Sequence, residues 1–350
     1  MRRIIGKDKN GKKILINVPS YDTIYVNNQF GLQTAYNIAI SSNDSGSASS
    51  STPVVSSTQK AIFGYGYNGS VLVSTTNKVS NTGVVATDTT GVGTARNGLA
   101  AAGYGTDKAI FGYGYDLSFN LSIKNLVSNT GVVANNVTGV GTARSQLAAA
   151  GYGSDKAIFG YGYSSDSGGN LSITNLVSNT GVVATDTTGV GTARYDLAAA
   201  GYGSDKAIFG YGSTGAVVSV TNLVSNTGIV SIDTTGVGTA RSGLAAAGYG
   251  SDKAIFGFGR NASIFTYYSV TNLVSNTGVV ATDTTGVGTA RYALAAAGYG
   301  GDKAIFGYGY NGSTYYSMTN LVSSTGVVAT DTTGVGTARN ALAAAGYSLS

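Results

Sequence analysis

LVSNTGVVATDTTGVGTARYDLAAAGYGSDKAIFGYG, from Leu176 to Gly212, recurs six times with few changes and makes up the chain after about residue 60. Two anchors define its period, a lysine that opens KAIFG and an arginine that closes GVGTAR, and each is 47 to 50 residues from its next copy. A unit of this length is too long for one coil of a β-solenoid and too rich in Gly, Val and Thr for paired helices. The repeat therefore predicts one four-stranded propeller blade.

The composition of the 350 residues excludes several kinds of active site. The chain has 53 glycines, two prolines and 11% charged residues, and it contains no His, Cys, Trp or Glu. The absence of His and Cys removes the most common metal ligands, disulfides, thiol nucleophiles and imidazole bases. We therefore predict no metal site and no cofactor, since only Asp, Lys, Tyr, Ser and Thr remain for chemistry.

The formal charge of +5 is concentrated at the N-terminus. Residues 1–13 hold six basic side chains against Asp8 alone, so the rest of the chain has no net charge. Six scattered charges around a predicted hairpin are more typical of a solvated face than of a phosphate-binding surface. Nucleic acid is therefore not an expected partner.

The sequence also lacks the pattern of a targeting or membrane segment. Met1 to Lys13 has no continuous apolar stretch of the kind that a secretory signal requires. Ser, Thr, Asn and Gly interrupt every apolar cluster, so no run approaches the length of a membrane span. We expect the chain to be made in a cytoplasm and not to insert into a membrane.

The residues before the repeats form two predicted segments. RRIIGKDKNGKKILINV predicts two strands around the turn Asn10-Gly11, and Asp22 to Ile40 predicts a strand and a short helix. A unit of residues 1–40 seldom folds alone without a metal or disulfide. We therefore expect it to act as an anchor that docks on the repeats, self-associates into a homo-oligomer or orders on a partner. Residues 41–59 are Ser-rich and predict a flexible linker to the array at 60–350.

The strands of a blade follow from the shape of a tapering sheet. LAAAGYG, such as Leu197 to Gly203, has small residues that suit the crowded innermost strand. KAIFGYG predicts the second strand, Ser219 to Gly228 contains the third, and VVATDTT, such as Val279 to Thr285, predicts a half-solvated outer strand. The blade is therefore expected to be a four-stranded antiparallel meander.

The two ends of the array indicate how it closes. The array opens at Lys60, in a second strand, and ends at Leu342 to Tyr347, in a first strand that has no blade after it. Closing the array into a ring supplies the missing first strand and leaves no strand without a blade, because the C-terminal strand completes the blade that begins at Lys60. An open solenoid, the alternative, would need atypical caps, which the sequence does not show. We predict an all-β fold, a propeller of six blades.

The repeat also resembles a known family. TARSGLAAAGYGSDKAIFGFG, from Thr239 to Gly259, is similar to the kelch repeat, in which an Arg precedes a small-residue strand and a hairpin leads to a strand that ends in a glycine pair. Here Gly210-Tyr211-Gly212 stands in place of the adjacent glycines, and Val183 stands where the family has Trp. The resemblance covers roughly residues 60–348 and implies a kelch-like β-propeller.

The sequence LVSNTGVVATDTTGVGTAR is similar to kelch-like arrays of tailed bacteriophages that are described as virion structural or fibre proteins. This resemblance implies a virion location, with residues 1–40 bound to other virion proteins. The favoured function is a non-catalytic virion appendage, of tail or capsid fibre type, that binds a host-surface glycan or protein. A purely architectural decoration protein is one alternative, and a cytoplasmic interaction scaffold or a carbohydrate-active enzyme is another.

Two segments differ among the six repeats, the one between GYG and TNLV and the pair directly after each arginine. In a meander both lie on one face of the ring, and their Tyr, Asn, Ser and Asp content suits recognition. The alternative is that exposed loops merely diverged after duplication. The candidate ligand-binding residues are Tyr195, Asp196, Arg260, Asn261, Phe265, Tyr267, Tyr268, Tyr292, Tyr315 and Tyr316.

One arginine per repeat forms a second candidate set. These residues would either bind an anion at the mouth of the axis or hold neighbouring blades together through loop carbonyls and aspartates such as Asp186, Asp283 or Asp331. We favour the structural role, because every repeat carries the residue beside its framework glycines. Repeat two has Asn136 in place of the aspartate. The predicted structural ring is Arg96, Arg144, Arg194, Arg241, Arg291 and Arg339.

Near-identical blades argue against catalysis. They place the same residues at symmetric positions, and no spacing singles out a pair of carboxylates for acid–base work. We therefore predict that the protein is not an enzyme.

Overall fold

The computed structural model describes residues 2–7, 13–18, 24–27, 33–36 and 59–347. The chain divides into two compact units, Met1–Val54 and Val55–Ser350. Each unit is considered by itself.

The described part of the first unit consists of two antiparallel strand pairs. Strand β1 (Arg2–Lys7) pairs with β2 (Lys13–Val18), as the sequence around Asn10-Gly11 predicts. Strand β3 (Ile24–Asn27) pairs with β4 (Gln33–Tyr36). The short helix that we expected in this second segment is wrong for the described residues, because Gln33–Tyr36 satisfies its backbone groups against β3. The predicted linker lies outside the described residues, except for Gln59.

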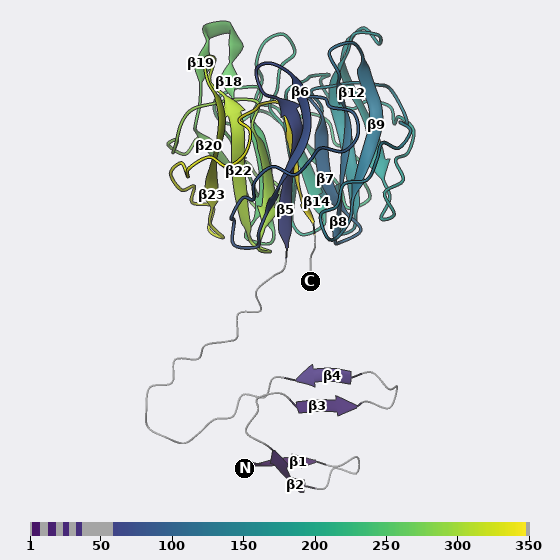
Figure 1. Ribbon diagram of the computed structural model, residues 1–350, viewed down its shortest axis with the longest axis vertical. Coiled ribbons are helices and arrows are strands. Elements are labelled where there is room, and N and C mark those ends of the chain that lie inside the picture. The colour runs from purple at the N-terminus through teal and green to yellow at the C-terminus, as the bar shows by residue number, and fades with distance from the viewer. Residues whose placement is uncertain (1, 8–12, 19–23, 28–32, 37–58, 348–350) are drawn as a thin grey trace. The chain divides into compact units, whose positions relative to one another are not determined.

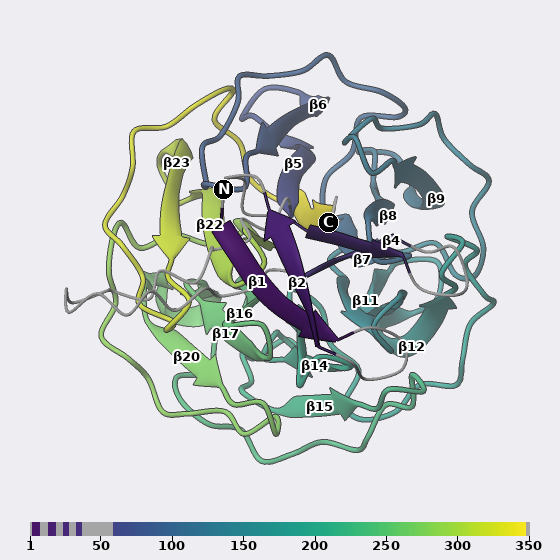
Figure 2. The same cartoon turned by 90° about the horizontal axis from the view of Figure 1, so that it is seen from below.

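The second unit contains six three-stranded antiparallel sheets within the described residues. They are arranged around a central axis (Figures 1 and 2). Their strands are β5 (Lys60–Tyr67), β6 (Leu72–Val79), β7 (Ala100–Tyr104), β8 (Lys108–Tyr115), β9 (Asn120–Val127), β10 (Ala148–Tyr152), β11 (Lys156–Ser164), β12 (Gly169–Val177), β13 (Ala198–Tyr202), β14 (Lys206–Gly210), β15 (Thr221–Val224), β16 (Ala245–Tyr249), β17 (Lys253–Gly257), β20 (Thr271–Val274), β21 (Ala295–Tyr299), β22 (Lys303–Tyr310), β23 (Tyr315–Val322) and β24 (Ala343–Tyr347).

The innermost strand of each sheet is AAAGY, and its small residues allow neighbouring sheets to meet at the axis. A Cβ atom added to Gly103 would lie 3.1 Å from the carbonyl oxygen of Gly346 in the next inner strand. The inner strands contact one another in the order β7, β10, β13, β16, β21, β24 and again β7. Small side chains are therefore a packing requirement at the axis, as the sequence predicts.

The second strand, KAIFG, supplies the hydrophobic core between neighbouring sheets. Phe159 is fully buried, and its ring fills the space beside Gly112 of the preceding sheet, where a Cβ atom would lie 2.7 Å from the ring. It packs edge-on against Tyr113 of that sheet, with 5.2 Å between ring centroids. The core is therefore a series of similar clusters, each shared by two sheets.

The fourth strand of each sheet is not formed, which corrects the four-stranded prediction. In the third repeat, for example, the outer segment meets the sheet only at two single pairs, Val177 with Val183 and Thr174 with Thr187. Between these pairs the backbone turns to place Asp186, whose carboxylate accepts hydrogen bonds from Thr142 and Asn175. A continuous ladder is lost because this aspartate bridges two repeats.

The C-terminal strand pairs with the first strand of the array. Ala343 of β24 is opposite Gly64 of β5, and Tyr347 is opposite Lys60, which is the same register as Ala148 opposite Gly160 in an uninterrupted repeat. The described second unit is thus an all-β fold of small antiparallel sheets, compatible with a β-propeller.

Gln59 belongs to the array, although we placed it in the linker. Its carbonyl oxygen accepts a hydrogen bond from the N–H of Gly300, and its Oε1 accepts one from Gly301. Elsewhere an aspartate carbonyl takes this position, as when Asp155 accepts from Gly105. A glutamine in place of that aspartate concealed the match in the sequence.

Candidate functional site

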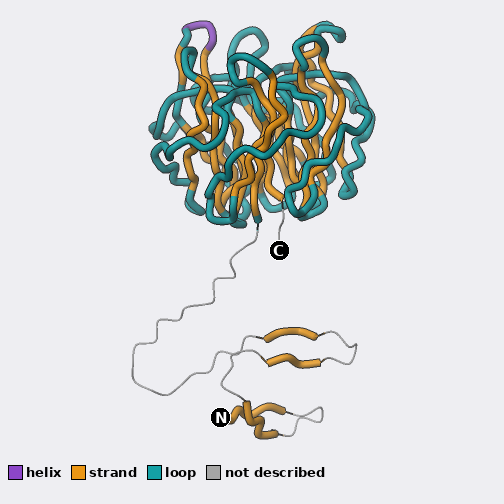
Figure 3. The backbone as a smooth tube through the Cα atoms, viewed as in Figure 1, coloured by secondary structure: helices purple, strands orange, loops and turns teal. Residues whose placement is uncertain are grey.

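The two variable segments of the repeats meet at one end of the second unit. The first residue after each arginine pairs with the residue that follows Gly-x-Gly, as in Ser242 with Arg260 and Tyr292 with Tyr310. One loop here is a hairpin of β18 (Arg260–Asn261) and β19 (Thr266–Tyr267), joined by the 3₁₀ turn η1 (Ala262–Ile264). Figure 3 shows its helical turn, in purple, at this end of the unit. The two variable segments therefore share one face, as the sequence predicts.

The second residue after each arginine forms a closed belt of backbone hydrogen bonds. Asp196 donates its N–H to the carbonyl oxygen of Gln146, and Gly243 donates to the carbonyl oxygen of Asp196. Every belt residue has a positive φ, between 50° and 61°, which costs a non-glycine residue about 1 kcal/mol. The belt fixes six turns at one end of the axis. Its members are Gly98, Gln146, Asp196, Gly243, Ala293 and Ala341.

The belt lines an axial cavity of about 380 Å³, within the range of roughly 300–1,000 Å³ that is common for small-molecule sites. Its wall includes Asp196, Arg260, Tyr292 and Gln146. Arg260 stacks on Tyr292, with Cζ 3.7 Å from the ring centroid. The cavity thus combines one cation, one carboxylate and two aromatic rings, those of Tyr115 and Tyr292.

Tyrosine rings form a continuous arc beside this cavity. Tyr267 stacks on Tyr292 with 5.7 Å between ring centroids, and Tyr292 meets Tyr310 at 5.9 Å. Tyr310 meets Tyr315 at 4.5 Å, and Tyr315 meets Tyr67 at 6.0 Å. The arc crosses three neighbouring sheets, and its five members are half-buried. Glycines make room for it, since a Cβ on Gly69 would lie 2.8 Å from the Tyr315 ring.

Other predicted site residues lie outside this arc. The ring of Tyr195 packs edge-on against the ring of Tyr163, outside the sheets that carry the arc, with 6.0 Å between ring centroids. Tyr316 accepts a hydrogen bond from Asn311 over 2.7 Å. Tyr268 lies near the buried Arg241, whose pKa is lowered by burial. Adjacent tyrosines therefore point in different directions.

Two further predicted residues shape the β18–β19 hairpin. Asn261 caps η1, accepting a hydrogen bond from the N–H of Ser263 over 3.1 Å. Phe265 is 82% exposed and has a φ of 50° at the hairpin tip. The structure thus gives Asn261 a local turn-forming contact and leaves Phe265 in solvent.

Sequence reasoning missed Tyr67 and Tyr310 of the arc. Both follow Gly-Tyr-Gly, as Tyr115 and Tyr163 do, so they open a segment predicted to be variable without being among its candidate residues. The signal that could have found them is their pairing with a variable residue, Tyr67 with Asn340 and Tyr310 with Tyr292.

Electrostatics distinguish the cavity from its surroundings. Burial raises the pKa of Asp196, while the nearby Arg260 and a hydrogen bond from Gln146 oppose this increase. Burial also raises the pKa of Tyr292, again with Arg260 opposing. The three side chains therefore lie within one another's electric field.

The six ring arginines lie between sheets and are fully buried. Arg194 donates from Nε to the carbonyl oxygen of Tyr211 and from its guanidinium to Oδ1 of Asn222, both in the following sheet. Its guanidinium stacks on Tyr161 of the preceding sheet, 4.3 Å from the ring centroid. Burial lowers the pKa of Arg291 to about 10, so this arginine stays charged at neutral pH. The arginines therefore contact carbonyls, asparagines and rings, rather than the mouth of the axis.

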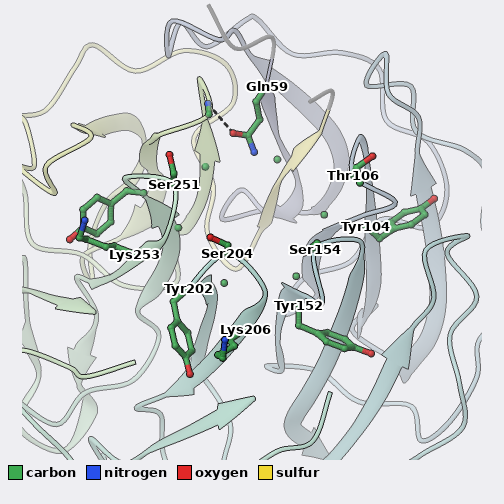
Figure 4. A pocket seen from close by; sticks show the side chains of 18 of the residues that line it. Gln59, Tyr104, Thr106, Tyr152, Ser154, Tyr202, Ser204, Lys206, Ser251 and Lys253 are labelled. Carbon is green, nitrogen blue, oxygen red and sulfur yellow. Dashed lines mark hydrogen bonds between the residues drawn. The ribbon is translucent and has the colours of Figure 1, made fainter. Parts of the chain in front are cut away.

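A second axial cavity, of about 370 Å³, lies at the opposite end of the unit (Figure 4). The tyrosines labelled there, Tyr104, Tyr152 and Tyr202, point away from the axis, so glycine backbone and short hydroxyl side chains face the opening. Each lysine that lines it pairs with the preceding aspartate, as Lys206 does with Asp205 at 2.6 Å. Because these residues repeat almost unchanged, we assign this cavity to the framework.

Neither a protein-family model nor a curated protein matches the chain. Among the described residues, no group of three or more acidic side chains is placed to hold a metal ion. In the same part of the chain, no helix has the length and hydrophobicity needed to cross a membrane.

Proposed function

We propose that the second unit is a six-bladed, kelch-like β-propeller. Six sheets contact their neighbours in a closed cycle, and the C-terminal strand completes the sheet that begins at Lys60. A closed ring leaves no end blade without a partner, which supports this assignment over an open solenoid.

We further propose that this propeller is the non-catalytic binding head of a virion appendage and that it attaches to a host-surface glycan or protein. The observation that carries the proposal is the arc of five tyrosine rings beside the axial cavity. Aromatic faces stack on the apolar faces of sugars, and the surrounding Asn, Asp and Arg side chains bond hydroxyl groups. The similarity of the repeat to phage-encoded arrays supports the virion location.

The cavity wall supports binding rather than hydrolysis. Glycoside hydrolases generally use two carboxylates on opposite sides of the scissile bond. Asp196 is the one carboxylate among the residues that line this cavity. A single acid of this kind suits ligand recognition.

A glycan and bacterial-envelope array, probed with the full chain, tests this function. Replacing Tyr267 and Tyr315 with Ala removes two rings of the arc and is expected to abolish binding. Replacing the adjacent Tyr268 and Tyr316 with Ala is the matched control, because these rings lie outside the arc, and binding is expected to persist. Equal loss in both double variants, with both proteins folded, would contradict a site on the arc.

A second candidate function, an architectural decoration protein, is favoured by one surface feature. The residue after each Asn-Thr-Gly or Ser-Thr-Gly turn is an aliphatic side chain that is 61% to 70% exposed. Such a ring suits contact with other particle proteins. This role would be favoured if the full chain bound no surface but still joined particles, and if deletion of residues 1–54 abolished that joining. The residues are Val84, Val132, Val182, Ile229, Val279 and Val327.

A further inference from the structure

The axial cavity beside the tyrosine arc departs from the sixfold pattern in its charges. The residue after Gly-x-Gly is tyrosine in four repeats and serine in one, but it is Arg260 in the fifth. The belt position is Gly, Ala or Gln in five repeats, but it is Asp196 in the third. Two opposite charges have thus been placed in a cavity that is otherwise neutral.

Arg260 is held in position without using its hydrogen-bonding capacity. Its backbone is fixed by reciprocal hydrogen bonds with Ser242, and its guanidinium stacks on Tyr292. None of the hydrogen bonds or ion pairs among the described residues involves that guanidinium, and its Nε is buried without an acceptor. The ring arginines differ, since Arg194 uses three of its N–H groups within the fold. The terminal N–H groups of Arg260 remain available to a ligand.

The carboxylate of Asp196 can accept hydrogen bonds from a ligand. The φ of 52° at this residue is imposed by the belt, which fixes its side chain at the axis. It lines the same cavity as Arg260, yet the two form no ion pair within 4.0 Å. Burial raises the pKa of Asp196, and the nearby Arg260 and one hydrogen bond from Gln146 oppose this increase. A ligand with hydroxyl donors would satisfy this carboxylate.

We propose that this cavity binds an acidic saccharide, a sugar unit that carries a carboxylate. Arg260 holds the carboxylate through its terminal N–H groups, Asp196 accepts hydrogen bonds from ring hydroxyls, and the tyrosine arc stacks on the next sugar. A phosphate dianion fits less well, because it would bring more negative charge beside Asp196. The inference rests on the proposed glycan-binding function of this face and names its ligand class.

The test uses the full chain and matched sugars. A glycan array carries oligosaccharides that contain uronic or nonulosonic acids, beside the same compounds with the carboxylate reduced to an alcohol. Calorimetry then measures the dissociation constant of each compound that binds. The acidic forms are expected to bind at least about tenfold more tightly than the reduced forms, and less tightly as salt rises.

Variants taken from the chain's own repeats separate binding from folding. Arg260→Tyr restores the residue of four other repeats, and Asp196→Gly restores the residue at Gly98 and Gly243, so both are expected to fold. Arg260→Tyr is expected to weaken binding of the acidic form by at least about tenfold, and to leave the reduced form unchanged. Asp196→Gly is expected to weaken both forms.

The outcomes distinguish this inference from the function on which it rests. Equal binding of acidic and reduced sugars, or unchanged binding by Arg260→Tyr, overturns the carboxylate assignment, and the glycan-binding function survives if Tyr267→Ala with Tyr315→Ala still abolishes binding. Absence of binding to every printed sugar overturns both the carboxylate assignment and the glycan-binding function.

Discussion

Nε of Arg339 donates a hydrogen bond to the carbonyl oxygen of Tyr65 over 2.8 Å and thereby joins residues that are 274 positions apart. Its guanidinium also donates to Asn77 and stacks on Tyr308, 4.2 Å from the ring centroid. These are the contacts that Arg194 makes with Tyr211, Asn222 and Tyr161 between consecutive repeats. The junction between the last and first sheets is therefore built like the others.

Replacing Arg339 with Met tests this equivalence. The variant leaves the carbonyl of Tyr65 and the side chain of Asn77 buried without their donor, and we expect a loss of about 3–5 kcal/mol in the free energy of unfolding. Arg194→Met is the matched control at an interior junction and is expected to lose a similar amount. Urea denaturation measures both. A loss below about 1 kcal/mol in Arg339→Met alone would show that the closing junction is weaker than the others.

Stability is expected to fall at acid pH because of the aspartates that bridge repeats. Partial burial raises the pKa of Asp88, but hydrogen bonds from Thr337 and Asn77 outweigh it, and the net pKa lies below the usual 3.8. Asp186, Asp233, Asp283 and Asp331 have lowered pKa values for the corresponding reasons. Their stabilisation is complete above the unfolded pKa and is lost as the pH falls through the folded pKa. Unfolding measured between pH 5 and pH 2 should show this decline, and a flat profile would contradict it.

Asn136 provides an internal comparison for this effect. It keeps the bridge by accepting from the backbone N–H of Thr94 and donating to its hydroxyl over 2.7 Å, so the second repeat is not left without a contact. Asn136→Asp should stabilise the protein by about 0.5 kcal/mol at pH 7, because a carboxylate is attracted to the neighbouring Arg96. The gain should vanish below pH 3. A gain that persists there would assign the effect to something other than charge.

The sequence predicts the parts of this fold that depend on side-chain size and on chain ends. Alanine and glycine in LAAAGYG require a crowded axis, and the unpaired Leu342 to Tyr347 requires a partner at Lys60. The outer strand could not be predicted, because Thr and Val in VVATDTT suit a ladder equally well. What prevents the ladder is the contact of Asp186 with Thr142 of the preceding repeat, and such a contact leaves no local pattern.

The candidate site could be predicted as a face but not as a set of contacts. Variation among the repeats places Asp196, Arg260 and the tyrosines at one end. It does not reveal that Tyr315 joins the arc while Tyr316 does not, because a register shift between Gly307 and Gly309 decides which side chain of β23 faces which side. That shift comes from the positive φ of the intervening tyrosine, 65° at Tyr308.

The glycines at the axis differ in how closely they are packed, which predicts different losses of stability when each is replaced by alanine. A Cβ on Gly346 would lie 3.0 Å from the carbonyl oxygen of Gly298, whereas one on Gly151 would lie 3.4 Å from that of Gly103. Gly346→Ala should therefore destabilise the protein by about 1–3 kcal/mol, as overpacking does, and Gly151→Ala by less. Thermal unfolding of the two variants measures the order. The reverse order would contradict the packing account.

Removing the C-terminal strand tests ring closure most directly. Deleting Leu342 to Ser350 takes away β24, whose Ala343, Ala345 and Tyr347 pack in the core with Ile62 and Phe111. It also leaves the inner edge of β5 without the partner that pairs with it from Lys60 to Gly64. We expect a loss of cooperative thermal unfolding, because the sheets on both sides of the gap lose a neighbour. Deleting residues 1–54 is the control, since Gln59 and all six sheets are retained, and it should leave the melting temperature of the second unit unchanged. A chain without β24 that melts as sharply and at the same temperature as this control would show that the array is stable as an open structure, and the propeller assignment would fail.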